Sequence, residues 1–216
     1  MIHFYYGSGS PYAWRVWLAL EHKALPYELQ LMSFSGGDLK TDAYRAINPR
    51  GRVPAIVDGD FVLYESAAIL DYLHEAYASS GAPLLPAETH RRAVARRMIR
   101  EADEYVAHAM EELVTQVLFT SEDQADAAKI AAARDDFLRE LDAFEHGCQA
   151  PFLLGEAGAV DFTLYPMLAL VLRMQDRKRR DLAVRERLGP RLDAWMRRVE
   201  ALPYFERTRP PHWKAA

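Results

Sequence analysis

Strand-like and helix-like patterns are unevenly distributed along the 216 residues of this chain. Before about residue 80, short aromatic and β-branched runs alternate with helical periodicity, whereas no convincing strand pattern follows. This restricts the fold to a mixed α/β unit followed by an all-α unit. The segment 79–87 contains Gly81, Pro83 and Pro86, which interrupt both patterns. We therefore predict a domain over 1–78, a linker over 79–87 and a helical domain over 88–216.

The first domain is predicted to contain a small mixed sheet with helices packed against it. The predicted strands are residues 2–6, 26–31, 54–57 and 61–64, and the last two form a hairpin around Asp58-Gly59-Asp60. Helical periodicity follows the first strand and resumes at Glu65. The resulting order is β-α-β, an irregular stretch, then β-β-α.

The second domain is predicted to be a bundle of amphipathic helices. Apolar residues recur at steps of three and four from Val94 to Leu113, again from Ile130 to Phe144, and once more from Leu192 to Leu202. The run Phe162–Leu172 is apolar on all sides, so we expect it at the centre of the bundle, with Pro166 as a local kink or an early-turn proline.

Composition excludes several classes of function. The formal net charge of −4 gives the molecule no overall attraction for nucleic acid or an anionic membrane, and the arginines between 91 and 100 are interpreted as a solvated helix face. Cys148 is the single cysteine, so neither an intramolecular disulfide nor a cysteine-rich zinc site is possible. The longest apolar run is far shorter than the ~20 residues of a membrane span, and the N-terminus lacks a signal-peptide pattern. We expect a soluble, cytoplasmic protein.

The histidines are predicted to lie on the surface or in linkers. None forms an i, i+4 pair or sits with acids at metal-ligand spacing, so no metal is expected. They are His3, His22, His74, His90, His108, His146 and His212.

Hydroxyl groups mark the turn between the first strand and the first helix. Ser8 and Ser10 lie in this turn, with Tyr6 and Tyr12 at its margins. A helix N-terminus favours an anion, and a hydroxyl donor there can stabilise a bound thiolate. Serine is also a favoured N-cap, so Ser10 suits either role.

Two further features stand next to predicted strands. Val53-Pro54 opens the hairpin, where the proline is either an ordinary turn residue or part of a cis bond. Glu65-Ser66 precedes the next helix, where an acid and a hydroxyl can bind an amine and a carboxylate or simply cap the helix.

Together these segments resemble the cytosolic glutathione S-transferase family, in particular its serine-dependent members. Ser10–Leu20 resembles the segment with the catalytic Ser or Cys, Asn48–Val57 the cis-proline loop, and Leu63–Leu73 the glutamate-serine motif. Leu154–Pro166 resembles the motif that caps a buried helix of the second domain. The resemblance implies a thioredoxin-like β-α-β-α-β-β-α domain with a C-terminal helical bundle. Its members use glutathione as co-substrate and form homodimers.

The resemblance also implies roles for individual residues. Ser10 would activate the glutathione sulfur, with Ser8 and Tyr6 next in line, and the Val53 backbone beside a cis Pro54 would pair with the cysteinyl backbone. The other implied glutathione contacts are Glu65 and Ser66 at the γ-glutamyl end, Lys40 or Arg52 at the glycine carboxylate, and Asp103 across the dimer axis. The implied electrophile pocket contains Tyr12, Trp14, Met110 and Val114.

Departures from the family pattern narrow the expected chemistry. Gly158 stands where the capping motif has Ser or Thr, a change worth only a few tenths of a kcal/mol. Arg52 stands where many members have Gln or Lys, and Ser10-Pro11-Tyr12 replaces the Ser-Ser-Cys run of the isomerase class. We expect conjugation of glutathione to small hydrophobic electrophiles. A glutathione-dependent disulfide reductase or peroxidase, and a non-catalytic interaction protein, are the alternatives.

Overall fold

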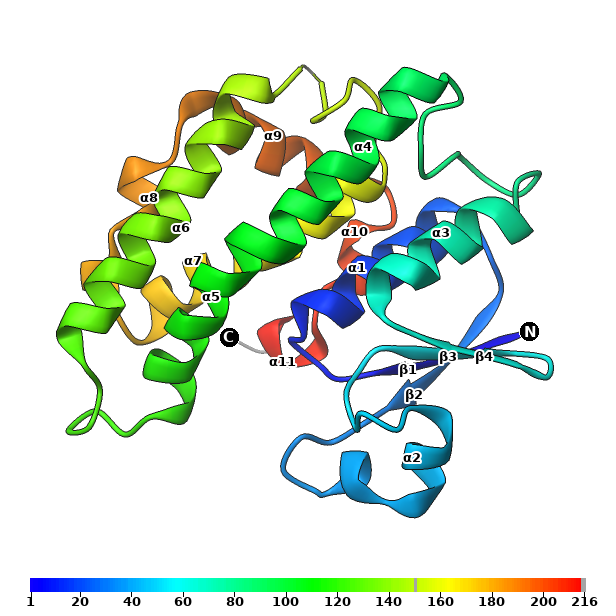
Figure 1. Cartoon of the computed structure of the whole chain (residues 1–216), viewed down its shortest axis with the longest axis horizontal. Coiled ribbons are helices and arrows are strands. Elements are labelled where there is room, and N and C mark those ends of the chain that lie inside the picture. Colours follow the sequence, from blue (N-terminus) through cyan, green and yellow to red (C-terminus); the bar gives the residue numbers. More distant parts are fainter. Residues whose placement is uncertain (150, 215–216) are drawn as a thin grey trace. The chain divides into compact units, whose positions relative to one another are not determined.

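The computed structural model describes residues 1–149 and 151–214, which form two compact units (Figure 1). The first unit contains Met1–Thr89 together with the segment from Leu202 onward, and the second contains His90–Ala201. The elements of the first unit are β1 (Ile2–Tyr6), α1 (Pro11–His22), β2 (Tyr27–Leu31), the 3₁₀ turn η1 (Asp38–Lys40), α2 (Asp42–Ile47), β3 (Ala55–Asp58), β4 (Phe61–Tyr64), α3 (Ser66–Ala76), α10 (Phe205–Thr208) and α11 (Pro211–Lys214).

The first unit is built on a four-stranded sheet in the order β2-β1-β3-β4. β1 pairs with β2 in parallel through the crossover helix α1, and β3 pairs antiparallel with both β1 and β4. Ile2, Phe4 and Tyr6 alternate onto the buried face of β1, as period-2 patterning requires. This is the predicted thioredoxin-like sheet.

The irregular stretch before the hairpin contains a helix. α2 begins after Thr41, whose hydroxyl accepts a hydrogen bond from the Tyr44 N–H at 3.2 Å. Only Tyr44 of its six residues is buried, so the segment carries almost no apolar periodicity. The apolar periodicity of the sequence therefore does not predict a helix over Asp42–Ile47, whereas the family resemblance implies one.

Helices are the regular elements that the structure describes in the second unit, apart from isolated β-bridges that join Leu154 to Gln149 and Glu156. Its elements are α4 (Thr89–Glu101), η2 (Ala102–Val106), α5 (Ala107–Val114), η3 (Thr115–Phe119), α6 (Ala127–Gly147), α7 (Ala159–Arg177), η4 (Arg180–Leu182), α8 (Val184–Arg187) and α9 (Pro190–Glu200). The long amphipathic helix predicted around 94–113 is present as α4, η2 and α5 in direct succession, and η2 and η3 are π-helical. No helix of the described chain is long and apolar enough to cross a bilayer.

α7 is the central helix of this unit, as its uniformly apolar sequence predicted. Asp161, in its first turn, is 1% exposed and accepts hydrogen bonds from the Leu153 N–H (3.0 Å), the Gly158 N–H (2.9 Å) and the Trp195 indole N–H (2.7 Å). Gly158 has no side chain to complete a reciprocal capping box. The Asp161 carboxyl joins the preceding loop and α9 to the start of α7. Burial raises the pKa of Asp161 to about 6, against the opposing effect of these donors.

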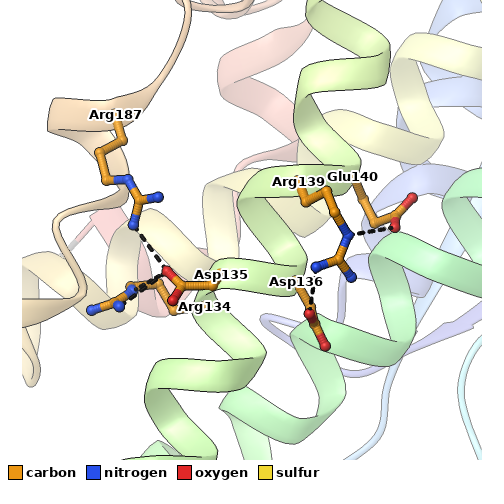
Figure 2. A network of polar contacts seen from close by, with 6 residues as sticks. All are labelled: Arg134, Asp135, Asp136, Arg139, Glu140 and Arg187. Carbon is orange, nitrogen blue, oxygen red and sulfur yellow. Dashed lines mark hydrogen bonds and ion pairs between the residues drawn. The ribbon is translucent and has the colours of Figure 1, made fainter.

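Ion pairs lie along the surface of α6, and one of them joins α6 to α8 (Figure 2). Asp135 of α6 lies 3.0 Å from guanidinium nitrogens of both Arg134 and Arg187, which lower the pKa of its carboxyl. One turn along, Arg139 pairs with Asp136 at 2.8 Å. All of these groups are at least partly exposed, so each pair contributes little to stability.

The chain after α9 packs on α1 of the first unit. The Trp14 indole N–H donates to the Thr208 hydroxyl at 3.0 Å, and Arg207 lies 2.8 Å from Glu21. His22 and the Tyr204 hydroxyl are hydrogen-bonded at 2.7 Å. The predicted helical domain extended to residue 216, whereas packing assigns the segment from Leu202 onward to the first unit.

Candidate active site

Sheet register brings the predicted motifs of the first unit to one edge of the sheet. Tyr5 of β1 lies opposite Ala55, and Ala55 lies opposite Tyr64 of β4. Tyr6 lies opposite Leu31 of the parallel strand β2. The segments that follow β1, β2 and β4 and the segment that precedes β3 therefore meet at this edge. Ser10, Lys40, Val53 and Ser66 all belong to these four segments.

The turn after β1 delivers Ser10 to the start of α1. The Ser10 N–H donates to the Gly7 carbonyl at 3.1 Å, and Gly9 has φ +88° at the corner of this turn. The Ser10 hydroxyl oxygen accepts from the Ala13 N–H at 3.2 Å, and Pro11 occupies the first helical position. Ser10 is therefore an N-cap. Because capping uses an acceptor site of the oxygen, the hydroxyl hydrogen remains available to donate.

The other hydroxyls near this turn have different surroundings. The Ser8 hydroxyl is hydrogen-bonded at 2.6 Å to Nδ1 of His212, which is exposed on the surface as predicted. Tyr6 is buried and its ring stacks on Phe4 with centroids 5.6 Å apart, and burial raises its pKa.

The loop before β3 is held rigidly and leaves one backbone unit unpaired. The Val53-Pro54 bond is cis, as the resemblance implied. The Arg52 carbonyl accepts from the Tyr44 hydroxyl and the Asn48 amide, both at 2.7 Å, and burial raises the pKa of Tyr44 to about 12, which keeps it a neutral donor. Within the described chain no hydrogen bond involves the Val53 backbone. Its N–H and C=O can thus pair with an extended peptide-like ligand.

The start of α3 has an unusual backbone. Glu65 has φ 71° and ψ 107°, a conformation that costs a non-glycine residue roughly 1–3 kcal/mol. Glu65, the N-cap residue of α3, makes no capping hydrogen bond with its side chain, and Ser66 at the first helical position is 7% exposed. The free N–H groups and the Ser66 hydroxyl suit a carboxylate, and the exposed Glu65, 3.6 Å from Arg50, suits an ammonium group.

Two cations flank this edge. Lys40 ends η1, and Arg52 lies in the loop that packs against it, since a Cβ on Gly51 would lie 2.8 Å from the Leu39 carbonyl oxygen. Both side chains are exposed. They are therefore accessible to a second carboxylate.

The predicted pocket residues have dissimilar environments. Tyr12 is half-buried on α1 beneath the Arg15 guanidinium, which is 5.6 Å from its ring centre. Trp14 is 3% exposed and packs against Phe205 and Trp213, so its side chain is part of the core of the first unit.

The remaining predicted residues belong to the second unit. Met110 is buried and Val114 is half-buried on α5, and Asp103, in η2, lines a polar hollow of about 320 Å³ with Arg100 and His108. Across the described residues no group of three His, Cys, Asp or Glu side chains is arranged to hold a metal ion.

Comparison with known proteins gives a consistent result. Residues 9–76 match the family model for the glutathione S-transferase N-terminal domain. Glutathione S-transferase 3 of Zea mays is 30% identical over 202 residues, which cover 92% of this chain and 89% of that protein. A glutathione S-transferase from the Antarctic clam Laternula elliptica superposes with a TM-score of 0.83 at 30% identity, covering 100% of this chain and 94% of the other. A glutathione transferase from Burkholderia graminis, solved with two glutathione molecules bound per subunit, shares the fold with a TM-score of 0.85 at 21% identity, over 97% and 88% of the two chains.

A thioredoxin-like sheet unit with a cis-proline loop, together with a helical unit, is the fold of the glutathione transferases that this chain resembles. The chain belongs to the glutathione S-transferase family and is a glutathione transferase.

Proposed function

We propose that this enzyme joins the thiolate of bound glutathione to small hydrophobic electrophiles, and that Ser10 donates a hydrogen bond to the sulfur. The observation that carries the proposal is the double capacity of Ser10, which accepts from Ala13 as an N-cap and keeps its hydrogen for an external acceptor. The positive end of α1 adds to this stabilisation. Both effects favour the thiolate over the thiol and lower the thiol pKa below its usual ~8.5.

The rest of the tripeptide is held by the groups at the same sheet edge. The Val53 backbone pairs with the cysteinyl backbone of glutathione, and its γ-glutamyl carboxylate and amine bind at Ser66 and Glu65. Lys40 and Arg52 face the glycine carboxylate. The strained Glu65 backbone supports this assignment, because such strain collects at ligand sites.

The reaction is a nucleophilic displacement or addition. The thiol proton leaves to solvent, the sulfur lone pair forms a bond to the electrophilic carbon, and a leaving group, where present, departs with its bonding electrons. The half-buried Tyr12 contributes to binding of the electrophile from the first unit, and Trp14 contributes by supporting the first turn of α1. The protein acts in the cytoplasm as a homodimer in which Asp103 reaches the partner subunit's glutathione.

Turnover with three substrates tests the proposal against its rivals. We expect conjugation of a model aryl halide to exceed reduction of hydroxyethyl disulfide and of cumene hydroperoxide. Faster disulfide or peroxide reduction would assign a reductase or peroxidase to the same site. Failure of a well-folded protein to bind glutathione resin would favour a non-catalytic interaction protein. In the aryl halide assay Ser10→Ala should lose most of its activity while it still binds glutathione, and full activity would reject Ser10 as the activating hydroxyl.

A further inference from the structure

The C-terminal segment of the first unit ends against the turn that carries Ser10. α10 is fixed on α1 by the hydrogen bond from Trp14 to Thr208 and by the ion pair between Arg207 and Glu21. In α11, Trp213 is 7% exposed and meets Trp14 edge to face, with ring centroids 5.2 Å apart. Figure 1 shows α11 (red) beside the start of α1 (blue). These contacts anchor α11 on the first turn of the helix that Ser10 caps.

From this anchored position His212 contacts the turn on two adjacent residues. Its Nδ1 is 2.6 Å from the Ser8 hydroxyl oxygen. Its ring also lies against Gly9, since a Cβ at that position would be 2.8 Å from the His212 Cε1 atom. The imidazole therefore packs on Gly9 and is hydrogen-bonded to Ser8. A side chain at residue 9 would be strained by the φ of +88° and would displace the imidazole of His212.

Ser8 and Gly9 are the two corner residues of the turn that ends at Ser10. Its closing hydrogen bond runs from the Ser10 N–H to the Gly7 carbonyl, and Gly7 itself is buried. The conformation of the corner determines where the Ser10 hydroxyl points. A group that holds the corner therefore acts on the sulfur through Ser10 without touching it.

The geometry points to His212 as a positioning residue for thiolate formation, which clamps the Ser8–Gly9 corner and so aims the Ser10 hydroxyl at the glutathione sulfur. This inference rests on the proposed role of Ser10. It assigns a function to the C-terminal segment that neither the family match over 9–76 nor the sequence patterns indicated. Hydrogen bonds that fix a reacting group within a fraction of an ångström are worth large factors in rate.

A double-mutant cycle on Ser8 and His212 tests the clamp. The readouts are the pKa of the enzyme-bound glutathione thiol, followed by thiolate ultraviolet absorbance, and kcat with an aryl halide. His212→Ala and Ser8→Ala should each raise the bound thiol pKa and lower kcat by about tenfold, with little change in KM for glutathione. The double variant should be no worse than either single one. His212→Asn, whose amide can replace Nδ1, should restore both readouts, and Lys214→Ala on the same short helix should match the wild type.

Two results would overturn the inference. One is a His212→Ala variant that matches Lys214→Ala in thiol pKa and kcat. The other is a set of additive losses from Ser8→Ala and His212→Ala, which would mean that the pair does not act as a unit. Ser10→Ala in the same series separates the two proposals. If it shifts the bound thiol pKa while His212→Ala does not, only the clamp fails, and if it shifts nothing, the proposed thiolate mechanism itself fails.

Discussion

Replacing Asp161 should weaken the second unit more than any exposed charge would. Asp161→Asn keeps an oxygen for the Leu153 and Trp195 donors but turns an N–H toward the Gly158 N–H. One buried donor is then left unsatisfied, which costs about 1–3 kcal/mol. Asp161→Ala leaves three buried donors without an acceptor, so we expect a loss on the order of 3–5 kcal/mol, a large part of a typical domain stability of about 5–15 kcal/mol.

The difference in the free energy of unfolding between the wild type and Asp161→Asn should depend on pH. The folded pKa of Asp161, about 6, lies above the unfolded value of ~3.9. A raised folded pKa means that folding takes up a proton, so this group's contribution is greatest below the unfolded pKa and is lost as pH rises through 6. Relative to Asp161→Asn, the wild type should gain on the order of 1 kcal/mol between pH 7 and pH 5.

Urea unfolding of the wild type and the variants at both pH values measures these quantities. Asp136→Asn is the matched control, because its carboxylate pairs with Arg139 on the exposed face of α6 (Figure 2). It should change the free energy of unfolding by about 0.5 kcal/mol or less. A stability of Asp161→Asn equal to that of Asp136→Asn, or a wild-type advantage that shrinks on acidification, would refute the role assigned to Asp161.

Two further predictions concern the first unit. Gly81→Ala should lower the free energy of unfolding by at least about 2 kcal/mol, because the new Cβ would lie 2.3 Å from the Lys23 carbonyl carbon in a backbone with φ +54°. Gly59→Ala, which has open space around it, should lower it by about 1 kcal/mol. Equal losses in thermal or urea unfolding would contradict the close approach at Gly81. Ser66→Ala should weaken glutathione binding by about tenfold in calorimetry, the effect of one lost hydrogen bond to a charged group, and unchanged affinity would remove Ser66 from the site.

The strands and the motifs were predictable because their signals are local. Alternation in Ile2–Tyr6 and the turn at Asp58-Gly59-Asp60 define β1 and the hairpin almost to the residue. The uniformly apolar run around Phe162 likewise identifies the central helix, α7. In each case the pattern of apolar and polar residues along a short segment reflects which side chains are buried.

The features that the sequence did not predict have no local pattern in the chain. The bond between Ser8 and His212 joins positions 204 residues apart, and neither residue has an unusual local context. The π-helical stretches η2 and η3 leave the apolar periodicity almost unchanged, so the pattern predicts an ordinary helix. Glu65 was recognised as a candidate ligand, but its positive φ has no signature in residue type. The sequence leaves open whether Ser10 caps the helix or donates a hydrogen bond to the glutathione sulfur. The cap uses the hydroxyl oxygen and the donation would use its hydrogen, so one residue type suits both roles.

The pKa of enzyme-bound glutathione, in the wild type and in Ser10→Ala, tests the central claim most directly. Titration of thiolate absorbance should give a wild-type value clearly below the ~8.5 of a free thiol. In Ser10→Ala the value should rise by about 1–2 units, which corresponds to one hydrogen bond to a charged group. An unshifted wild-type pKa, or the same pKa in both proteins with glutathione bound, would contradict thiolate stabilisation by Ser10.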